Sequence, residues 1–140
     1  MKRMQGSCFI DTNVLIYCYS ATEPAKKQKA VEVSNTENAI ISTQVLKEFS
    51  NTLSKKFRLD WADIEQSLNE LKNNFKIYIN SPRTIQNACL IASKYGYSFY
   101  DSLIIESALE TDCSILYSED LQHNQLIENK LRIINPFLDD

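Results

Sequence analysis

The sequence has 140 residues, of which 44% are hydrophobic and 24% are charged, and its formal net charge is −3 at pH 7. This length suits a single domain over residues 1–140, and the hydrophobic content argues against a disordered chain. The acidic balance argues against a large basic surface for nucleic acid, but it leaves room for a small site in which a cation offsets several acids.

Four cysteines, Cys8, Cys18, Cys89 and Cys113, stand in no C-x-x-C pair and are accompanied by a single histidine. This pattern argues against a structural zinc site and predicts reduced cysteines in apolar surroundings. The first apolar run, residues 8–10, is too short for the hydrophobic region of a signal peptide, and no stretch approaches the roughly 20 apolar residues of a membrane span. We therefore expect a cytoplasmic protein that does not enter the membrane.

In chain order, the first predicted element is a buried strand over residues 8–10, followed by Asp11-Thr12-Asn13 and an apolar helical stretch over residues 14–19. Asp11 therefore stands at the carboxyl end of a strand, where open α/β sheets keep their ligand crevice. A second interpretation stays open at this point. Asp11, Thr12 or Asn13 caps the next helix and does nothing else, since all three residue types favour N-caps.

The middle of the chain alternates between helical and strand-like stretches. Helices are predicted over residues 25–33, from Ser42-Thr43 to about residue 57, over 61–75, and from Ser81-Pro82 to Gly96; strands are predicted over 39–41 and 76–79. Proline at the first helical position and glycine just past the last one support the fourth of these helices.

A further helix is predicted to begin at Asp101 and to run to about residue 109, with apolar residues on more than one face, so it is expected to be central. Strands follow over residues 113–117 and 131–134, and the first of them ends at the acidic run Ser118-Glu119-Asp120. Strands that alternate with helices predict an α/β fold, with a mainly parallel sheet of four to five strands covered by helices on both sides.

Four acids from separate segments are expected at one edge of this sheet: Asp11, Glu48, Asp101 and Asp120. Clustered carboxylates raise the pKa of one another and are costly to hold together without a cation. A ligand set of oxygens alone favours Mg²⁺ or Mn²⁺, as one ion or two. Such an ion lowers the pKa of a bound water and neutralises phosphate charge, which suits the hydrolysis of phosphodiesters.

Four motifs resemble those of PIN domains and, more narrowly, of the VapC-type toxins of bacterial toxin–antitoxin pairs: FIDTNVL at residues 9–15, QVLKEF at 44–49, YDSLI at 100–104 and LYSEDLQ at 116–122. The resemblance extends over residues 9–136. It implies a three-layer fold and a Mg²⁺- or Mn²⁺-dependent endoribonuclease whose acidic quartet falls on Asp11, Glu48, Asp101 and Asp120. It further implies an RNA substrate, an antitoxin partner, a homodimer, and hydrogen bonds from Thr12, Asn13 and Ser118 that orient the acids.

Several neighbouring residues compete for these roles. The resemblance favours Asp120 over Glu119, which is expected to point elsewhere, and Glu106 is expected to be exposed or in a salt bridge. His123, a lone histidine in a polar loop, is expected neither to bind RNA nor to move a proton. Asn124 stands where relatives often carry glycine, and asparagine tolerates the left-handed conformation better than most residues.

Two surface patterns have two interpretations each. The first pattern is a set of basic residues that form either a flank for RNA or ordinary helix surface: Lys47, Lys55, Lys56 and Arg58. The second pattern is a set of tyrosines that either stack on unpaired bases or are core or partner-contact residues: Tyr17, Tyr19, Tyr95, Tyr97 and Tyr100. The helices over residues 14–19 and 45–57 are candidate walls of an antitoxin groove. Two alternative functions remain: an RNA-processing PIN nuclease without an antitoxin, and a non-catalytic PIN-like binding module whose acids are caps or a docking surface.

Overall fold

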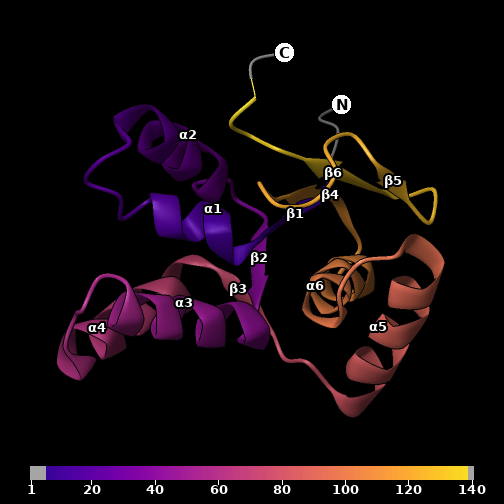
Figure 1. Cartoon of the computed structure of the whole chain (residues 1–140), viewed down its shortest axis with the longest axis horizontal. Helices are drawn as coiled ribbons and strands as arrows, with labels where there is room; N and C mark the ends of the chain where they lie inside the picture. Colours follow the sequence, from indigo (N-terminus) through magenta and orange to yellow (C-terminus); the bar gives the residue numbers. More distant parts are fainter. Residues whose placement is uncertain (1–5, 139–140) are drawn as a thin grey trace.

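Within residues 6–138, the part of the chain that this computed structural model describes, six strands form one sheet with β1 and β4 at its centre (Figure 1). The strands are β1 (Ser7–Ile10), β2 (Ala39–Ser42), β3 (Lys76–Tyr78), β4 (Cys113–Tyr117), β5 (Leu126–Ile127) and β6 (Leu131–Ile134). Their order is β3-β2-β1-β4-β6-β5, and every neighbouring pair is parallel except the antiparallel β5 and β6. The carboxyl ends of β1, β2 and β4 therefore lie along the same edge of the sheet.

Helices cover both faces of this sheet (Figure 1). On one side lie α1 (Thr12–Tyr17), α2 (Pro24–Ser34), α3 (Thr43–Lys55) and α4 (Trp61–Asn74), and on the other lie α5 (Pro82–Tyr95) and α6 (Phe99–Glu110). The predicted α/β fold, with a mainly parallel sheet between two helical layers, is confirmed. The sheet of the described residues has six strands, where the sequence predicts four to five.

The centre of the sheet is buried because its strands carry long apolar side chains on both faces. Phe9 and Ile10 of β1, Ile41 of β2 and Leu116 of β4 have no exposed surface. α6 is buried from Ser102 to Leu109, which confirms the prediction of a central helix, and it packs against α5 and β4. This rigid centre fixes the positions of the loops that leave the carboxyl ends of β1 and β4.

Serine side chains fix where two of the helices begin. Ser42, rather than Thr43, caps α3, because its hydroxyl accepts the Val45 N–H at 3.4 Å. Ser98 caps α6 by accepting the Asp101 N–H at 3.2 Å. α6 therefore begins at Phe99, so the prediction that Asp101 opens this helix is wrong by less than one turn. Asp101 lies instead in the first turn of α6, where a negative charge is favourable.

β5 is absent from the prediction because two residues are too few to show the alternation of apolar and polar side chains that marks a strand. It pairs with β6 through a tight turn in which Glu128 and Asn129 have φ angles of 50° and 58°. Two successive positive φ angles are typical of a hairpin turn, but the usual glycine signal is missing here.

The four cysteines are free thiols, as predicted. Cys8 and Cys113 are buried, while Cys89 is exposed on α5, so the prediction of apolar surroundings is wrong for this one residue. Along residues 6–138 the helices are too short or too polar to cross a membrane.

Candidate functional site

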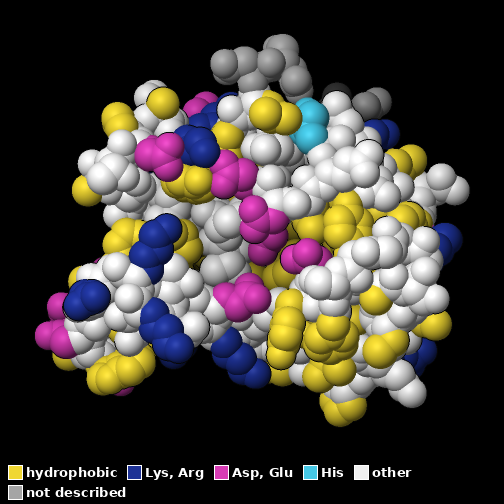
Figure 2. Space-filling model, in the orientation of Figure 1, with side chains coloured by type: hydrophobic (Ala, Val, Ile, Leu, Met, Phe, Trp, Pro, Cys, Tyr) yellow, Lys and Arg dark blue, Asp and Glu magenta, His cyan; other side chains and the backbone are white. Residues whose placement is uncertain are grey.

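A cavity of about 790 Å³ opens at the carboxyl ends of β1 and β4, between α1, α3 and α6. All four predicted acids line it: Asp11, Glu48, Asp101 and Asp120. Figure 2 shows acidic side chains gathered in the middle of this face, between the half that contains α1 to α4 and the half that contains α5 and α6. The sheet thus brings carboxylates that are distant in sequence to one hollow.

Asp11 is the most deeply placed of these acids, with only 6% of its surface exposed. Its Oδ1 accepts the Thr12 N–H at 2.7 Å and so caps α1. Its Oδ2 accepts the Ser118 hydroxyl at 2.8 Å and the Asn13 side-chain amide at 3.4 Å. Burial raises the pKa of Asp11 to about 7, against the lowering effect of these hydrogen bonds, and the negative charges of Glu48 and Asp101 raise it further.

Glu48 is held over the cavity by two side chains. The Thr12 hydroxyl donates to its Oε1 at 2.6 Å, and the Gln44 amide donates to its Oε2 at 3.2 Å. The same Gln44 nitrogen donates to the Tyr100 carbonyl at 3.1 Å, so Gln44 also connects α3 to α6. In the sequence, Gln44 stands out only as part of the QVLKEF motif. Its spacing of four residues from Glu48, which puts both on one helix face, is the signal for the contact with Glu48.

Asp120 is tied to α1 through Asn13. The Asn13 amide nitrogen donates to Asp120 Oδ2 at 3.0 Å, and the Asn13 oxygen accepts the Glu119 N–H at 3.1 Å. The Ser118 hydroxyl accepts the Asp120 N–H at 3.2 Å. The resemblance selects three residues to orient the acids: Thr12, Asn13 and Ser118. Each of them forms a hydrogen bond to one of the acids.

Asp101 is half-buried and reaches the cavity from the first turn of α6. Among residues 6–138, no three Asp, Glu, Cys or His side chains are arranged to hold a metal ion as they stand. The donor set nevertheless suits a hard divalent cation, because it consists of carboxylate oxygens, although Asp120 is exposed and only Asp11 is buried enough for its charge to be penalised. Gln44 Oε1 adds an oxygen that is buried and has no hydrogen-bond partner within the described residues.

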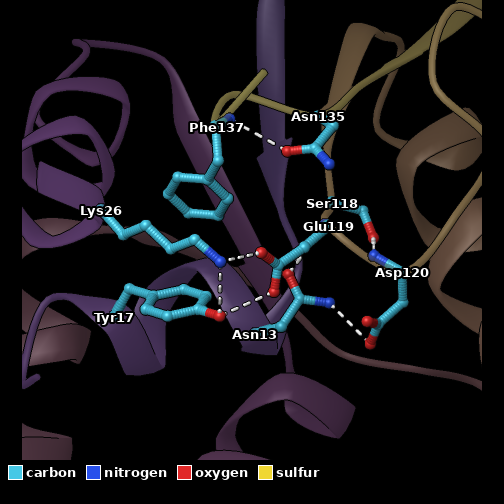
Figure 3. Close-up of polar contacts among 8 residues, drawn as sticks. All are labelled: Asn13, Tyr17, Lys26, Ser118, Glu119, Asp120, Asn135 and Phe137. Atoms are coloured by element: carbon cyan, nitrogen blue, oxygen red, sulfur yellow. Dashed lines mark hydrogen bonds and ion pairs between the residues drawn. The ribbon is translucent and has the colours of Figure 1, made fainter. Parts of the chain in front are cut away.

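Glu119 points away from the other acids, as predicted, toward α1 and α2 (Figure 3). Its two oxygens accept the Lys26 ammonium at 2.7 Å and the Tyr17 hydroxyl at 2.8 Å. The hydrogen bond with Glu119 raises the pKa of Lys26 above its ordinary value, so Lys26 stays protonated. The sequence gives no signal for this contact, because Lys26 lies in a lysine-rich helical stretch that is typical of a solvent-exposed helix face.

Glu106 departs from its prediction, because it is buried rather than exposed, and it lies outside the lining of the acidic cavity. Burial raises its pKa to about 8, and its hydrogen bond with Glu110 and the charge of that residue add to the shift. Glu110 in turn accepts the Tyr78 hydroxyl at 2.5 Å and the Thr84 hydroxyl at 2.7 Å. The pair therefore belongs to the packing of α6 against α5 and β3.

Three further expectations concern His123, Asn124 and the basic residues near the end of α3. His123 Nδ1 accepts the Asn135 N–H at 2.9 Å, which gives this ring a structural contact. Asn124 has a φ of 69°, so the left-handed conformation expected for it is confirmed. Of the four basic residues considered as an RNA flank, only Lys56 lines the cavity.

A family model for the PIN domain matches residues 8–128 of the chain. A search of curated proteins finds no match. Among solved structures, the chain is similar to VapC20 from Mycobacterium tuberculosis, a sarcin–ricin loop cleaving toxin, with 18% identity over 81% of this chain and 90% of that chain, and a TM-score of 0.65.

Two further structures contain toxin–antitoxin proteins. A toxin–antitoxin complex from Klebsiella pneumoniae has 21% identity over 93% of this chain and 98% of that chain, with a TM-score of 0.70. VapBC2 from Rickettsia felis, bound to a DNA fragment from its promoter, has 16% identity over 91% and 98% of the two chains, with a TM-score of 0.64. At these identities the likeness shows a shared fold.

Proposed function

The chain belongs to the PIN domain family, and on that basis we propose that it is a divalent-metal-dependent endoribonuclease that acts as the toxin of a toxin–antitoxin pair. The names of its structural neighbours support this proposal, since one is a toxin that cleaves the sarcin–ricin loop and others are toxin–antitoxin proteins. The observation that carries the proposal is the acidic cavity, which is lined by carboxylates from four separate segments of the chain.

The proposed cofactor is Mg²⁺ or Mn²⁺, as one ion or two, held by the quartet Asp11, Glu48, Asp101 and Asp120. A divalent cation bound there supplies a water of lowered pKa and positive charge to offset that of a phosphodiester. The raised pKa of Asp11 supports this assignment, because the buried carboxylate lacks a compensating positive charge among the groups that shift it. Its proton would be released when a cation binds.

The neighbouring polar residues supply preorganisation. Thr12 fixes one oxygen of Glu48 and Ser118 fixes one oxygen of Asp11, so both carboxylates are held in place before substrate arrives. Reactive groups that are already in position avoid the entropic cost of ordering them during the reaction. The cavity volume of about 790 Å³ falls within the range of sites for small ligands, which suits unpaired nucleotides better than a duplex.

We also propose an antitoxin partner and a homodimer. Beyond the acids, the cavity continues between α1 and the end of α3, where Ile16 and Tyr17 of α1 line it together with Phe57, which lies just after α3. An antitoxin segment that lies on these apolar side chains can bring a basic side chain to the carboxylates. For the dimer, the support is the exposed apolar surface of α5, where Ile85 and Leu90 are 42% and 69% exposed.

The decisive experiment measures Mn²⁺ binding and RNA cleavage with the purified full chain. Calorimetric titration should detect Mn²⁺ binding, and single-stranded RNA should be cleaved with Mn²⁺ but not with a chelator. Asp11→Asn and Asp101→Asn should each stay folded, lose cleavage, and no longer be toxic on expression. An asparagine at either position removes a charged oxygen ligand and preserves the shape of the side chain.

Asp112→Asn is the matched control, because Asp112 is an exposed aspartate whose side chain faces Lys130 at the surface. This variant should cleave RNA like the wild type. Full cleavage by Asp11→Asn, or a wild-type protein that neither binds Mn²⁺ nor cleaves RNA, would contradict the proposal. Neutralisation of toxicity by the product of a small open reading frame just upstream would separate a toxin from an RNA-processing nuclease.

A further inference from the structure

Glu119 and Asp120 are adjacent in sequence, yet their side chains point in different directions (Figure 3). Asp120 turns toward Asn13, whereas Glu119 turns toward Lys26 and Tyr17. Each oxygen of Glu119 has one partner, the Lys26 ammonium at 2.7 Å and the Tyr17 hydroxyl at 2.8 Å. Lys26 also donates to the Tyr17 oxygen at 3.2 Å, so the three side chains close a triangle of hydrogen bonds.

Two aromatic rings surround the ammonium group of this triangle. The Lys26 nitrogen lies 4.8 Å from the centre of the Tyr17 ring and 5.5 Å from that of Phe137. The two rings pack edge to face, with centres 4.9 Å apart. The charged partners retain 33% and 25% of their side-chain exposure, so the pair is largely shielded from solvent. A shielded pair that is supported by aromatic faces contributes more than an ordinary surface ion pair.

The triangle acts on the loop that carries Asp120. On one side of this loop, Asn13 accepts the Glu119 N–H at 3.1 Å and donates to Asp120 Oδ2 at 3.0 Å. On the other side, Lys26 and Tyr17 hold the Glu119 side chain. The loop is thereby clamped between α1 and α2. Because Glu119 also lines the acidic cavity, release of its side chain would free another carboxylate next to Asp120.

We propose that Lys26 is a positioning residue for the acidic site. Through Glu119 it holds the loop after β4 so that Asp120 faces the other acids, and it keeps the Glu119 carboxylate away from the cation position. This inference rests on the proposed function, because it assigns a role in cation binding and cleavage to a residue that acts on the acidic quartet only through Glu119.

The test compares Lys26→Met with Lys29→Met, which removes the same charge from an exposed position farther along α2. Two measurements on the full chain are made: Mn²⁺ affinity by calorimetry, and the backbone amide NMR shifts of Asp120 and Leu121 without metal. Lys26→Met should move both amide resonances and lower Mn²⁺ affinity about tenfold. It should also lower kcat for RNA cleavage with little change in KM. Lys29→Met should leave all these quantities unchanged.

Two further variants distinguish positioning from general destabilisation. Lys26→Arg should restore most of the Mn²⁺ affinity, because arginine can still bind the Glu119 carboxylate. Lys26→Met combined with Glu119→Gln should lower the affinity no further than Lys26→Met alone, since both substitutions break one contact.

Equal effects of Lys26→Met and Lys29→Met, or unchanged Mn²⁺ affinity and amide shifts in Lys26→Met, would overturn the inference. Failure of the proposed function looks different: the wild-type protein itself would then show neither Mn²⁺ binding nor RNA cleavage. In that case Lys26 has no cation site to position, and the inference fails together with the proposed function. The amide shifts then report only whether the triangle holds the loop after β4.

Discussion

Asp11 uses its two oxygens for different contacts. One oxygen accepts the Thr12 N–H and caps α1, while the other accepts the Ser118 hydroxyl at the wall of the acidic cavity. The cap and the cavity position, which the sequence alone presents as two interpretations of this residue, are therefore compatible. Its role as a cation ligand stays a prediction that the variants described above can test.

Glu106 gives a prediction about pH at the same scale. Its pKa is raised from 4.5 to about 8, mainly by burial, so the folded protein keeps a proton that the unfolded chain releases. The stabilisation from this proton is full below pH 4.5 and is lost as the pH rises to about 8. The loss amounts to at most about 1.4 kcal/mol per pH unit. The melting temperature of the wild type should therefore fall between pH 6 and pH 8.

Glu106→Gln removes this titration and keeps the shape and hydrogen-bonding capacity of the side chain. Its melting temperature should depend less on pH over the same range, as measured by differential scanning fluorimetry. Glu65→Gln, on an exposed position of α4, should follow the wild-type curve. Parallel curves for Glu106→Gln and the wild type would show that Glu106 is ionised in the folded protein.

At the scale of elements, the sequence predicts strands well where a mostly apolar run of four or five residues stands between polar turns. The bounds predicted for β4 and β6 match the structure, since both strands are flanked by polar turns. β5 has too few residues for a period to be detected. The start of α6 depends on whether Ser98 or Asp101 provides the cap, and the sequence offers both. Propensity alone cannot decide between neighbouring caps, because the packing of the helix on its neighbours sets the final choice.

Gly96 ends α5 in the left-handed conformation, with a φ of 79°. A methyl group at this position would meet no atom within 4 Å, so any cost of substitution comes from the backbone conformation alone. Gly96→Ala should therefore destabilise the protein by about 1 kcal/mol, measured by chemical denaturation. Gly96→Asn should cost less, because asparagine visits this conformation more readily. Equal stability of Gly96→Ala and the wild type would contradict this account.

At the scale of the whole molecule, the acidic cavity exists because β1 and β4 are neighbours although about 100 residues separate them in sequence. Alternating strands and helices predict that acids at strand ends share an edge, and this covers Asp11 and Asp120. The contacts that join separate elements around the cavity are harder to predict. The bond from Gln44 to the Tyr100 carbonyl and the triangle of Lys26, Tyr17 and Glu119 join separate elements, and no local pattern signals them.

The charge distribution of the molecule gives a prediction about RNA. The net charge is −3, so attraction of RNA must come from local basic groups near the cavity. Lys55 and Lys56 are both exposed, but only Lys56 lines the cavity. In an Asp101→Asn background that blocks cleavage, Lys56→Ala should reduce the slope of log Kd against log salt by about 0.7, the value for one phosphate contact to single strands.

The measurement is fluorescence anisotropy with labelled single-stranded RNA at several salt concentrations. Lys55→Ala in the same background serves as the control, because it removes the same charge from the adjacent residue. Equal slopes for the two lysine variants would show that the contact with RNA does not pass through the cavity rim.

Both edges of the sheet are short, with three residues in β3 and two in β5. An edge strand exposes unpaired backbone groups that can recruit a strand from another molecule, and brief edges that carry lysine, as Lys76 does in β3, discourage this. The fold therefore offers little template for strand-to-strand aggregation.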